Sequence, residues 1–362
     1  MSAVVRIGLV GYGDVGRIHA LCWKSLPFYY PGESWRVEIV GVATSREETA
    51  AAAAREIGCS FFTTDIEELV THPDVDLVDC VTPDHLHASV SIPALRAGKH
   101  VYCEKPMART VEEAAAMLDA ARTSGRVNAI ALPVRFAPAV LRARQLVDEG
   151  LLGRAISFRT WLLHSGYVDP DRPMSWRLDA DVAAGGALFD LGAHNVDLIR
   201  FLVGEFTSVT ARTETVVPKR PVEPGSEEKR SVEVDDLSIA VAELDGGAVG
   251  SLEFSRVATG ITDGPLLEVH GTDGAFRING VRPTRLEVFD RHRDEGFREV
   301  IVPERWPRLG FVPLQYDVAR AIVENRPASV TFEDGYRAQV VLEAIRTAGQ
   351  KRGWVDVPSA PA

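Results

Sequence analysis

The first third of the chain alternates short apolar runs with longer segments of helical period. Val, Ile and Leu fill the short runs, whereas in the longer segments apolar residues recur every three or four positions, as on one face of a helix. The short runs predict strands at residues 4–10, 36–43, 75–82, 100–104 and 127–132. The longer segments predict helices at residues 15–26, 46–58, 85–98 and 110–125. This alternation favours an α/β fold of the Rossmann type, a doubly wound parallel sheet with helices on both faces.

After Pro133 the rhythm changes, because most strand-like segments then follow one another without helices between them. The predicted strands are 154–163, 207–217, 236–244, 248–255, 266–271, 275–279, 285–290 and 298–302. The predicted helices are 137–150, 187–203, 312–325 and 335–351. Consecutive strands without crossover helices indicate an antiparallel sheet in an α+β domain. The charged, proline-rich segment 218–230 is expected to be a mobile loop.

Length and charge narrow the class of protein. At 362 residues the chain is too long for one ordinary core, so we expect two domains, residues 1–133 and 134–362. A formal net charge of -11 argues against binding to nucleic acid, which needs a basic footprint. No window approaches the roughly 18 uninterrupted apolar residues of a membrane-spanning helix, so no membrane association is expected.

The cysteines and the amino terminus bear on the compartment. The four cysteines, which show no CxxC spacing, are Cys22, Cys59, Cys80 and Cys103. Cys80 and Cys103 lie in apolar runs and are expected in the core. We therefore predict reduced thiols, no zinc or other metal site and a reducing compartment. The first residues lack a basic segment followed by a long apolar core, so a cytoplasmic protein without a signal peptide is expected.

A glycine loop follows the first predicted strand and opens the first helix. Gly11, Gly13 and Gly16 have the GxGxxG spacing, which in this context is typical of a dinucleotide-binding turn. The residues between them, expected to contact the cofactor as well, are Tyr12, Asp14 and Val15. The alternative is a glycine turn without a ligand, which the position in the first βα unit makes the weaker interpretation.

The end of the second strand bears on the choice between NAD and NADP. An acidic residue there would bind the ribose of NAD, but the sequence has Thr44, Ser45 and Arg46. Two hydroxyls and an arginine suit a 2′-phosphate, so the residues favour NADP. The alternative is that Arg46 is an exposed residue in the first turn of a helix.

The segment "TPDHLH" follows the third predicted strand, where ligands gather in an open parallel sheet. Thr82, Pro83, His85 and His87 are therefore candidate cofactor contacts. The two histidines are two positions apart and face different sides of a helix, which disfavours a shared metal. We expect one ring to contact the cofactor or to cap local backbone, and the other to be solvated or packed.

In "GKHVYCEKPM" a proline follows Glu104 and Lys105 at the end of a buried run. Pro106 disfavours a helical conformation for Lys105, which would then lie at the tip of the strand. A lysine at a strand tip is often simply solvated. Whether Lys105 instead has a functional role depends on which groups lie near that tip.

The segment "GGALFDLGAHNVDLIRFLVG" follows Gly185 and Gly186. On a helix, Asp190, His194 and Asp197 share one face, and a carboxylate one turn before a histidine can orient the ring. The alternatives are an ordinary surface pair for Asp190 and His194, and a structural role for Asp197. The two glycines allow another backbone segment or a ligand to approach closely.

Together these motifs closely resemble the Gfo/Idh/MocA oxidoreductase family over nearly the whole chain, including the late segment "FEDGYRAQVVLEAI". The resemblance implies a domain at 1–133 that binds NAD or NADP. It also implies a domain at 134–362 with a large open, mainly antiparallel sheet that binds substrate and forms a homodimer or homotetramer. Lys105 would orient the reacting hydroxyl at the nicotinamide end, and Glu104 would contact the cofactor beside it. His194 would be the general acid/base with Asp190 as its partner. Asp84, where asparagine is frequent in the family, and the missing acid of the second strand depart from its pattern.

The expected activity is reversible oxidation of a secondary alcohol on a sugar, cyclitol or glycoside. Segment 164–179 combines an aromatic face with hydrogen-bond donors, as sugar sites do. It supplies the candidate substrate contacts His164, Trp176 and Arg177, to which Arg135 is added. The alternatives are Trp176 as a core residue and Arg177 in an ion pair.

Two other functions occur in the same fold. One is an NAD-dependent glycoside hydrolase that oxidises its sugar transiently, and the other is a non-catalytic regulator that senses dinucleotide. The presence of Lys105, Asp190 and His194 argues against the regulator, which needs no proton-transfer group.

Overall fold

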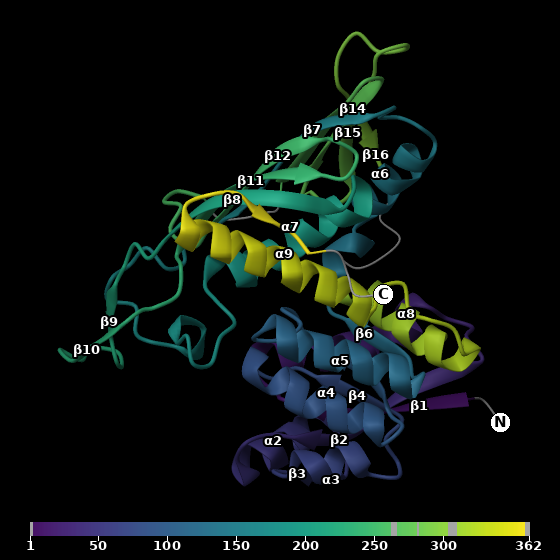
Figure 1. The fold of residues 1–362 in the computed structure, drawn as a ribbon. Coiled ribbons are helices and arrows are strands. Elements are labelled where there is room, and N and C mark those ends of the chain that lie inside the picture. The colour runs from purple at the N-terminus through teal and green to yellow at the C-terminus, as the bar shows by residue number, and fades with distance from the viewer. Residues whose placement is uncertain (1–2, 262–265, 281, 303–309, 359–362) are drawn as a thin grey trace. The chain divides into compact units, whose positions relative to one another are not determined.

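The structure is a computed structural model that describes residues 3–261, 266–280, 282–302 and 310–358. Its chain divides into two compact units, Met1–Pro133 with Trp306–Tyr336 and Val134–Arg305 with Arg337–Ala362 (Figure 1). Helix α8 (Phe311–Glu324) returns to the first unit, where Tyr316 stacks on Tyr30 with ring centroids 3.5 Å apart. The sequence pattern, with its one change of rhythm at Pro133, gives no sign of this return.

The first unit contains six parallel strands in the order β3-β2-β1-β4-β5-β6. The strands are β1 (Ala3–Val10), β2 (Trp35–Ala43), β3 (Phe61–Thr63), β4 (Leu77–Cys80), β5 (His100–Cys103) and β6 (Asn128–Ile130). The helices between them are α1 (Asp14–Tyr29), α2 (Glu47–Ile57), α3 (Ile66–Thr71), α4 (His87–Arg96) and α5 (Val111–Ser124), with a 3-10 turn at Asp84–Leu86. The doubly wound parallel sheet predicted from the sequence is confirmed.

The sequence pattern did not predict β3 and α3. β3 has three residues and α3 has six, so neither is long enough for its hydrophobic period to stand out. The start of α3 is set instead by Asp65, whose carboxylate accepts a hydrogen bond from the backbone N–H of Glu67.

The strand order positions the candidate motifs. β1 lies between β2 and β4, so the chain winds outward in opposite directions on its two sides. Ligands of such sheets bind beyond the carboxyl ends of the strands at this reversal. The glycine loop follows β1, "TPDHLH" follows β4 and "EKP" follows β5. Because β1, β4 and β5 are neighbours, the sheet brings the three motifs to one edge.

The second unit is built on nine strands in the order β16-β15-β14-β13-β7-β12-β11-β8-β17. They are β7 (Ala155–Leu163), β8 (Phe206–Glu214), β11 (Leu237–Leu244), β12 (Val249–Ser255), β13 (Leu266–Gly271), β14 (Gly274–Asn279), β15 (Arg285–Asp290), β16 (Arg298–Ile301) and β17 (Val355–Asp356). Its helices are α6 (Pro138–Asp148), α7 (Ala187–Leu202) and α9 (Phe332–Lys351), the last from Arg337 onward. β7 and β12 pair in parallel and the other described neighbours pair antiparallel, which confirms the mainly antiparallel sheet.

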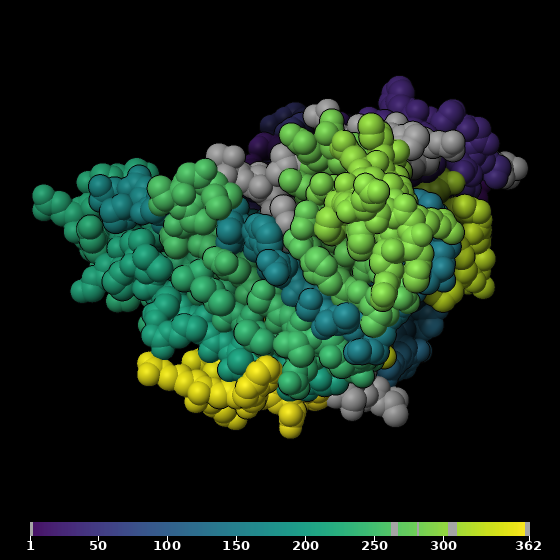
Figure 2. All heavy atoms as spheres, turned by 90° about the horizontal axis from the view of Figure 1, so that it is seen from above, coloured from purple at the N-terminus to yellow at the C-terminus, as the bar shows by residue number. Residues whose placement is uncertain are grey.

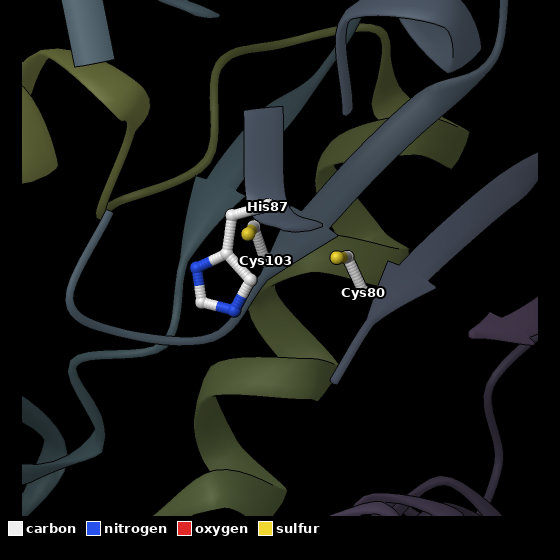
Figure 3. A group of neighbouring side chains, drawn as sticks. All are labelled: Cys80, His87 and Cys103. Carbon is white, nitrogen blue, oxygen red and sulfur yellow. The ribbon is translucent and has the colours of Figure 1, made fainter. Parts of the chain in front are cut away.

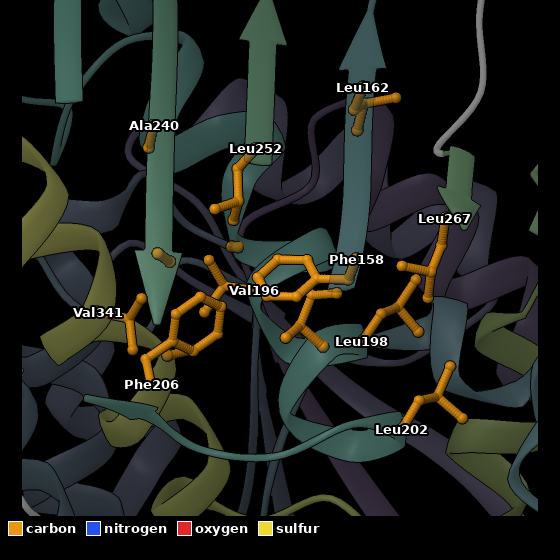
Figure 4. Packing of buried hydrophobic residues seen from close by; sticks show 14 of the residues in the cluster. Phe158, Leu162, Val196, Leu198, Leu202, Phe206, Ala240, Leu252, Leu267 and Val341 are labelled. Carbon is orange, nitrogen blue, oxygen red and sulfur yellow. The ribbon is translucent and has the colours of Figure 1, made fainter. Parts of the chain in front are cut away.

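The core of this unit lies between one face of the sheet and α7. Phe158 of β7, Leu252 of β12 and Val196 of α7 are buried together there (Figure 4). Burying one side chain of this size on folding stabilises the folded state by about 1.5–3 kcal/mol. Most residues of α7 are buried, so the helix that carries Asp190 and His194 is held firmly against the sheet.

The other face of the sheet carries exposed aliphatic side chains. Ile239 and Val241 of β11 alternate with buried alanines and are 45% and 38% exposed. Val249 of β12 is 45% exposed. Figure 2 shows this part of the molecule, with β7 as a teal band between its green neighbours.

Segment 218–230 is not a plain loop, and that prediction is wrong. β9 (Lys219–Pro221) and β10 (Lys229–Ser231) form an antiparallel ribbon. The buried Arg220 guanidinium donates to the backbone carbonyls of Tyr167 and Asp169, at 2.6 and 2.7 Å. This arginine, which the pattern counted among the loop charges, ties the ribbon to segment 164–179.

No described helix of the structure is both long and apolar enough to cross a membrane.

Candidate active site

The glycine loop has the geometry that a pyrophosphate requires. Gly11 has φ +94°, and a Cβ there would lie 2.4 Å from the carbonyl oxygen of Val81. A Cβ on Gly16 would lie 2.6 Å from the carbonyl oxygen of Gly11, whereas one on Gly13 would meet no atom within 4 Å. α1 thus begins next to open space, with no side chain capping its first N–H groups. Such a helix end binds phosphate, so these residues fit a dinucleotide.

The residues between the glycines have different environments. Tyr12 is half-buried and lies under the Arg17 guanidinium, 5.6 Å from its ring centroid. Asp14, the first residue of α1, is exposed, and Val15 is half-buried.

The end of β2 presents polar groups to solvent. Ser45 and Arg46 are exposed, and Arg46 immediately precedes α2. The Thr44 hydroxyl donates to the carbonyl of Arg46 at 3.0 Å and lies 2.6 Å from the hydroxyl of Thr49. The loop is therefore folded by its own hydroxyls while the guanidinium stays accessible.

His87 joins the two loops that follow β4 and β5. Its Nδ1 lies 2.9 Å from the carbonyl oxygen of Pro106, and its Nε2 lies 2.9 Å from that of Thr82. Both partners are acceptors, an arrangement that favours the doubly protonated ring. Burial alone would lower the pKa of His87, but the charges of Cys80 and Asp84 raise it. His87 is fully buried and caps backbone, so its nitrogens are not available to the cofactor contact expected from the sequence. His85, Thr82 and Pro83 stay partly exposed at this edge.

Two cysteines lie beside His87, although they are 23 positions apart in the sequence. Cys80 and Cys103 are register partners on β4 and β5, both are buried as predicted, and Figure 3 shows them with His87. Sulfur and nitrogen atoms of the three residues lie within 4.8 Å of one another. Burial opposes ionisation of Cys80, but the Cys103 hydrogen bond and the His87 charge lower the pKa of its thiol. Because both ring nitrogens of His87 face backbone carbonyl oxygens, neither is directed at a metal shared with the two sulfurs.

Lys105 follows β5 and is half-buried, and its peptide bond to Pro106 is cis. Glu104 is buried, and its Oε2 accepts a hydrogen bond from the backbone N–H of Lys105 at 3.1 Å. The other carboxylate oxygen of Glu104 lies 3.0 Å from Nε2 of His19, a residue of α1. The lysine is thus placed by a carboxylate that a second buried side chain holds.

On α7, Asp190 and His194 are one helical turn apart, and both are half-buried. Asp190 accepts a hydrogen bond at 3.1 Å from Nη2 of Arg256, whose side chain is only 1% exposed. The helix begins at Ala187, and Asp235 holds its amino terminus: the Asp235 carboxylate accepts from the N–H groups of Gly186 and Leu188 at 3.0 and 2.8 Å. Burial raises the pKa of Asp235, and these two hydrogen bonds partly offset the rise.

Gly186 resolves one alternative of the sequence analysis. A Cβ at this position would lie 1.8 Å from the carbonyl oxygen of Asp235. The close approach that the double glycine permits is therefore made by another backbone segment.

Segment 164–179 brings aromatic and cationic groups together. The Arg177 guanidinium lies over the Trp176 ring, 4.4 Å from its centroid, and both residues are half-buried. His164 accepts from the N–H of Gly166 at 3.0 Å, and its ring is 5.9 Å from that of Tyr167. Trp176 is thus partly accessible rather than a core residue, and it carries the arginine on its face.

Arg135 has a different environment. Its guanidinium donates twice to the carboxylate of Asp197, at 2.7 and 2.5 Å, and it is 7% exposed. Such a buried bidentate pair favours a structural role over the expected substrate contact. It also gives Asp197 the structural role that the sequence suggested.

Sequence reasoning missed three side chains at the motifs: His19, Asp79 and Arg256. Asp79 is an acidic residue inside an apolar strand, which in itself signals a buried partner. His19 lies four positions before Trp23, on the buried face of α1. These two signals were available, whereas nothing in the sequence links Arg256 to Asp190.

Known proteins resemble the chain over its full length. Residues 5–131 match the model described as oxidoreductase family, NAD-binding Rossmann fold, and residues 140–277 match the GFO/IDH/MocA C-terminal domain. Levoglucosan dehydrogenase of Pseudarthrobacter phenanthrenivorans is 36% identical over 99% of both chains. The 1,5-anhydro-D-fructose reductase of Ensifer adhaerens is 34% identical over 66% of this chain and 67% of its own.

A solved levoglucosan dehydrogenase in complex with NADH and levoglucosan superposes with a TM-score of 0.93 at 36% identity. The alignment covers 98% of this chain and 100% of that one. Both domains, the relatives and the fold agree with the family resemblance and with the prediction of an oxidoreductase enzyme. The chain belongs to the Gfo/Idh/MocA family of oxidoreductases, with an amino-terminal NAD-binding Rossmann fold.

Proposed function

We propose that the protein reversibly oxidises a secondary alcohol of a sugar, an anhydrosugar or a cyclitol. The observation that carries this proposal is the placement of Lys105. It lies at the same carboxyl edge of the Rossmann sheet as the glycine loop, and the carboxylate of the buried Glu104 accepts a hydrogen bond from its backbone N–H. The full-length likeness to a levoglucosan dehydrogenase supports an anhydrosugar as the first substrate to test.

The proposed chemistry assigns one task to each side chain. The bound dinucleotide supplies the hydride acceptor at its nicotinamide. Lys105 holds the substrate hydroxyl through its ammonium group and stabilises the alkoxide that forms. His194 removes the hydroxyl proton, a role that suits the histidine side chain, which in general exchanges protons near neutral pH. Asp190 orients the His194 ring from one turn earlier, and Arg256 fixes Asp190 in turn.

The glycine loop and the free N-terminus of α1 would hold the pyrophosphate, since Gly13 leaves open space there. The end of β2 would choose between NAD and NADP. Exposed Arg46 and the neighbouring hydroxyls of Thr44 and Ser45 support a 2′-phosphate, whereas a relative with NADH supports NAD. We keep the sequence-based preference for NADP as the hypothesis to test by titration.

We assign substrate contacts of the second unit to segment 164–179. The Trp176 ring offers an apolar face, and Arg177 and His164 add polar groups beside it. A sugar presents both faces of this kind, with C–H groups on one side and hydroxyls at the rim.

We further propose that the protein forms a homodimer or homotetramer through the sheet of the second unit. Ile239, Val241 and Val249 are exposed on one face of adjacent strands β11 and β12. Covering them with a second copy removes apolar surface from water.

The free cysteines agree with a reducing compartment, and the cytoplasm is the proposed location.

The test is a screen at 340 nm with anhydrosugars, monosaccharides, inositols and glycosides, each with NAD and with NADP. We expect turnover with at least one anhydrosugar or cyclitol, and loss of turnover in folded Lys105→Ala and His194→Ala variants. Release of free sugar from a glycoside without net reduction of cofactor would instead identify an NAD-dependent hydrolase. Dinucleotide binding with no turnover across the panel would support a sensing regulator.

A further inference from the structure

A buried three-residue network lies beneath the carboxyl edge of the Rossmann sheet. His19 of α1 faces Asp79 of β4 through Nδ1, at 3.0 and 3.1 Å from the two carboxylate oxygens. Its Nε2 lies 3.0 Å from Oε1 of Glu104, the residue just before Lys105. The Trp23 indole donates a further hydrogen bond to Asp79 at 2.7 Å. The network therefore ties α1, which follows the glycine loop, to the segment after β5 that carries the lysine.

The two partners of His19 determine its charge. Each ring nitrogen faces a carboxylate, so both nitrogens donate and the ring is an imidazolium between two anions. Burial alone would lower the pKa of His19, but the charges and hydrogen bonds of Asp79 and Glu104 raise it to about 10. His19 and Asp79 are fully buried, and a removed cation would leave two carboxylates facing each other in a dry site.

The other neighbours of His19 shield it from water. The Tyr102 ring stacks on the imidazole with centroids 5.1 Å apart, and the Phe311 ring lies 4.9 Å away. Cys22 is a further titratable group at this network, and burial and the charge of Asp79 raise the pKa of its thiol to about 12. Tyr102 is buried as well, which raises the pKa of its hydroxyl. Both therefore stay neutral around pH 7 to 9.

We infer that His19 is a positioning residue for Lys105 and acts through Glu104, an assignment that rests on the catalytic role proposed for the lysine. Glu104 uses one oxygen for His19 and the other for the backbone N–H of Lys105. While His19 holds the first oxygen, the Glu104 carboxylate keeps one orientation. The peptide group between Glu104 and Lys105, which donates to the second oxygen, then keeps one orientation too. Without the imidazolium, Glu104 either takes up a proton or turns toward another cation, and Lys105 loses its fixed direction.

The main test compares His19→Gln with the wild type. We expect kcat to fall about 10- to 100-fold, since a small misplacement of a reacting group has an effect of this size. The dissociation constant of the dinucleotide and the KM of the substrate should change much less. In a Lys105→Ala background the same substitution should cause no further loss, because the group that His19 positions is already gone.

A second measurement does not depend on turnover. Nitrogen-15 NMR of the histidine side chains in the protein without cofactor should show the His19 ring doubly protonated up to about pH 9, and its signal is assigned by comparison with His19→Gln. That signal should disappear in His19→Gln. If His19→Gln does not fold, Glu104→Gln keeps the size of the side chain but leaves one acceptor oxygen for the two N–H donors of His19 and Lys105, and the same fall in kcat is expected.

His100→Gln is the matched control. His100 starts the strand β5 that Glu104 follows, and its Nδ1 accepts from the N–H of Val127 at 3.0 Å, so its loss should lower stability without altering kcat. An active Lys105→Ala variant would overturn the proposed function itself. An inactive Lys105→Ala with normal kcat in folded His19→Gln would overturn only the role of His19. A His19 ring that carries a single proton at pH 8 would contradict the charged network.

Discussion

Arg256 donates a hydrogen bond from Nη2 to Oδ2 of Asp190 at 3.1 Å, from a side chain that is only 1% exposed. Its Nη1 lies 3.3 Å from the carbonyl oxygen of Arg177, and its guanidinium lies over the Tyr167 ring, 4.9 Å from the centroid. One buried cation therefore joins the helix of the proposed acid/base pair to the segment proposed to bind the sugar.

Replacing this cation should disturb both. In Arg256→Met, Asp190 loses its charged partner, so we expect kcat/KM to fall at least about 10-fold and the free energy of unfolding to fall by about 1–3 kcal/mol. Arg256→Lys keeps the charge but not the two-armed geometry, and should recover part of the activity. Steady-state kinetics and urea unfolding measure the two effects.

Arg200→Met is the matched control for Arg256. Arg200 lies on α7, the helix of Asp190 and His194, with a side chain that is 4% exposed, and it pairs with Glu205 at 2.8 Å. Its loss should reduce stability with little change in kcat/KM. Equal losses of kcat/KM in the two variants would contradict the assigned role of Arg256.

Lys105 and His194 should act as one unit on a common substrate. We expect Lys105→Ala and His194→Ala each to lower kcat by about 10³-fold or more. The double variant should be only slightly worse than either single variant, as for residues of one catalytic machinery. Single-turnover kinetics in the three variants measure this, and fully multiplicative losses would show that the residues act independently.

Stability should depend on pH through His19. Its pKa in the folded protein, about 10, exceeds the ordinary value of about 6.5, so the folded state binds the extra proton between these values. The stabilisation is complete below about pH 6.5 and is lost as pH rises through about 10. Between these two pH values, each unit of rise in pH should lower the free energy of unfolding by about 1.4 kcal/mol through this group.

Urea unfolding of the cofactor-free protein from pH 6 to pH 10 checks this slope. Other groups titrate in the same range, so the quantity to compare is the difference between wild type and His19→Gln. The slope should be shallower in the variant. Parallel curves would mean that His19 is not an imidazolium in the folded state.

Cofactor choice should respond to the end of β2. Arg46→Ala should weaken NADP binding about 10-fold and leave NAD binding nearly unchanged, because only NADP carries the 2′-phosphate. Ser45→Asp should shift the preference toward NAD by adding a carboxylate beside the ribose. Fluorescence titrations measure both, and tighter binding of NAD than of NADP by the wild type would refute the NADP preference.

The exposed face of the nine-stranded sheet should decide the oligomeric state. Ile239→Asp with Val241→Glu places two charges on β11 where the proposed interface is apolar, so the assembly should dissociate toward the monomer. Light scattering coupled to size exclusion gives the mass. A control at Val216, which is 52% exposed outside the strands, should keep the wild-type mass. A monomeric wild type would rule out this interface.

The sequence alone determined the alternating Rossmann unit, the change to consecutive strands after Pro133 and the motifs at the ends of β1, β4 and β5. These features are local, because hydrophobic period, glycine spacing and proline each act within a few residues. The sequence pattern did not predict short or interrupted elements for the same reason. β3 and α3 are too brief to show a period, and charge and proline concealed the β9–β10 ribbon.

Only the tertiary structure decided what holds the candidate site. His19 and Glu104 are 85 positions apart, Asp190 and Arg256 are 66 apart, and Arg135 reaches Asp197 across 62. No sequence period relates such residues, because they meet only when separate strands and helices pack. Motif residues such as Lys105 show where chemistry can occur, whereas the buried ions that orient them are fixed by burial, since a charge removed from water must find its counter-charge wherever the fold provides it.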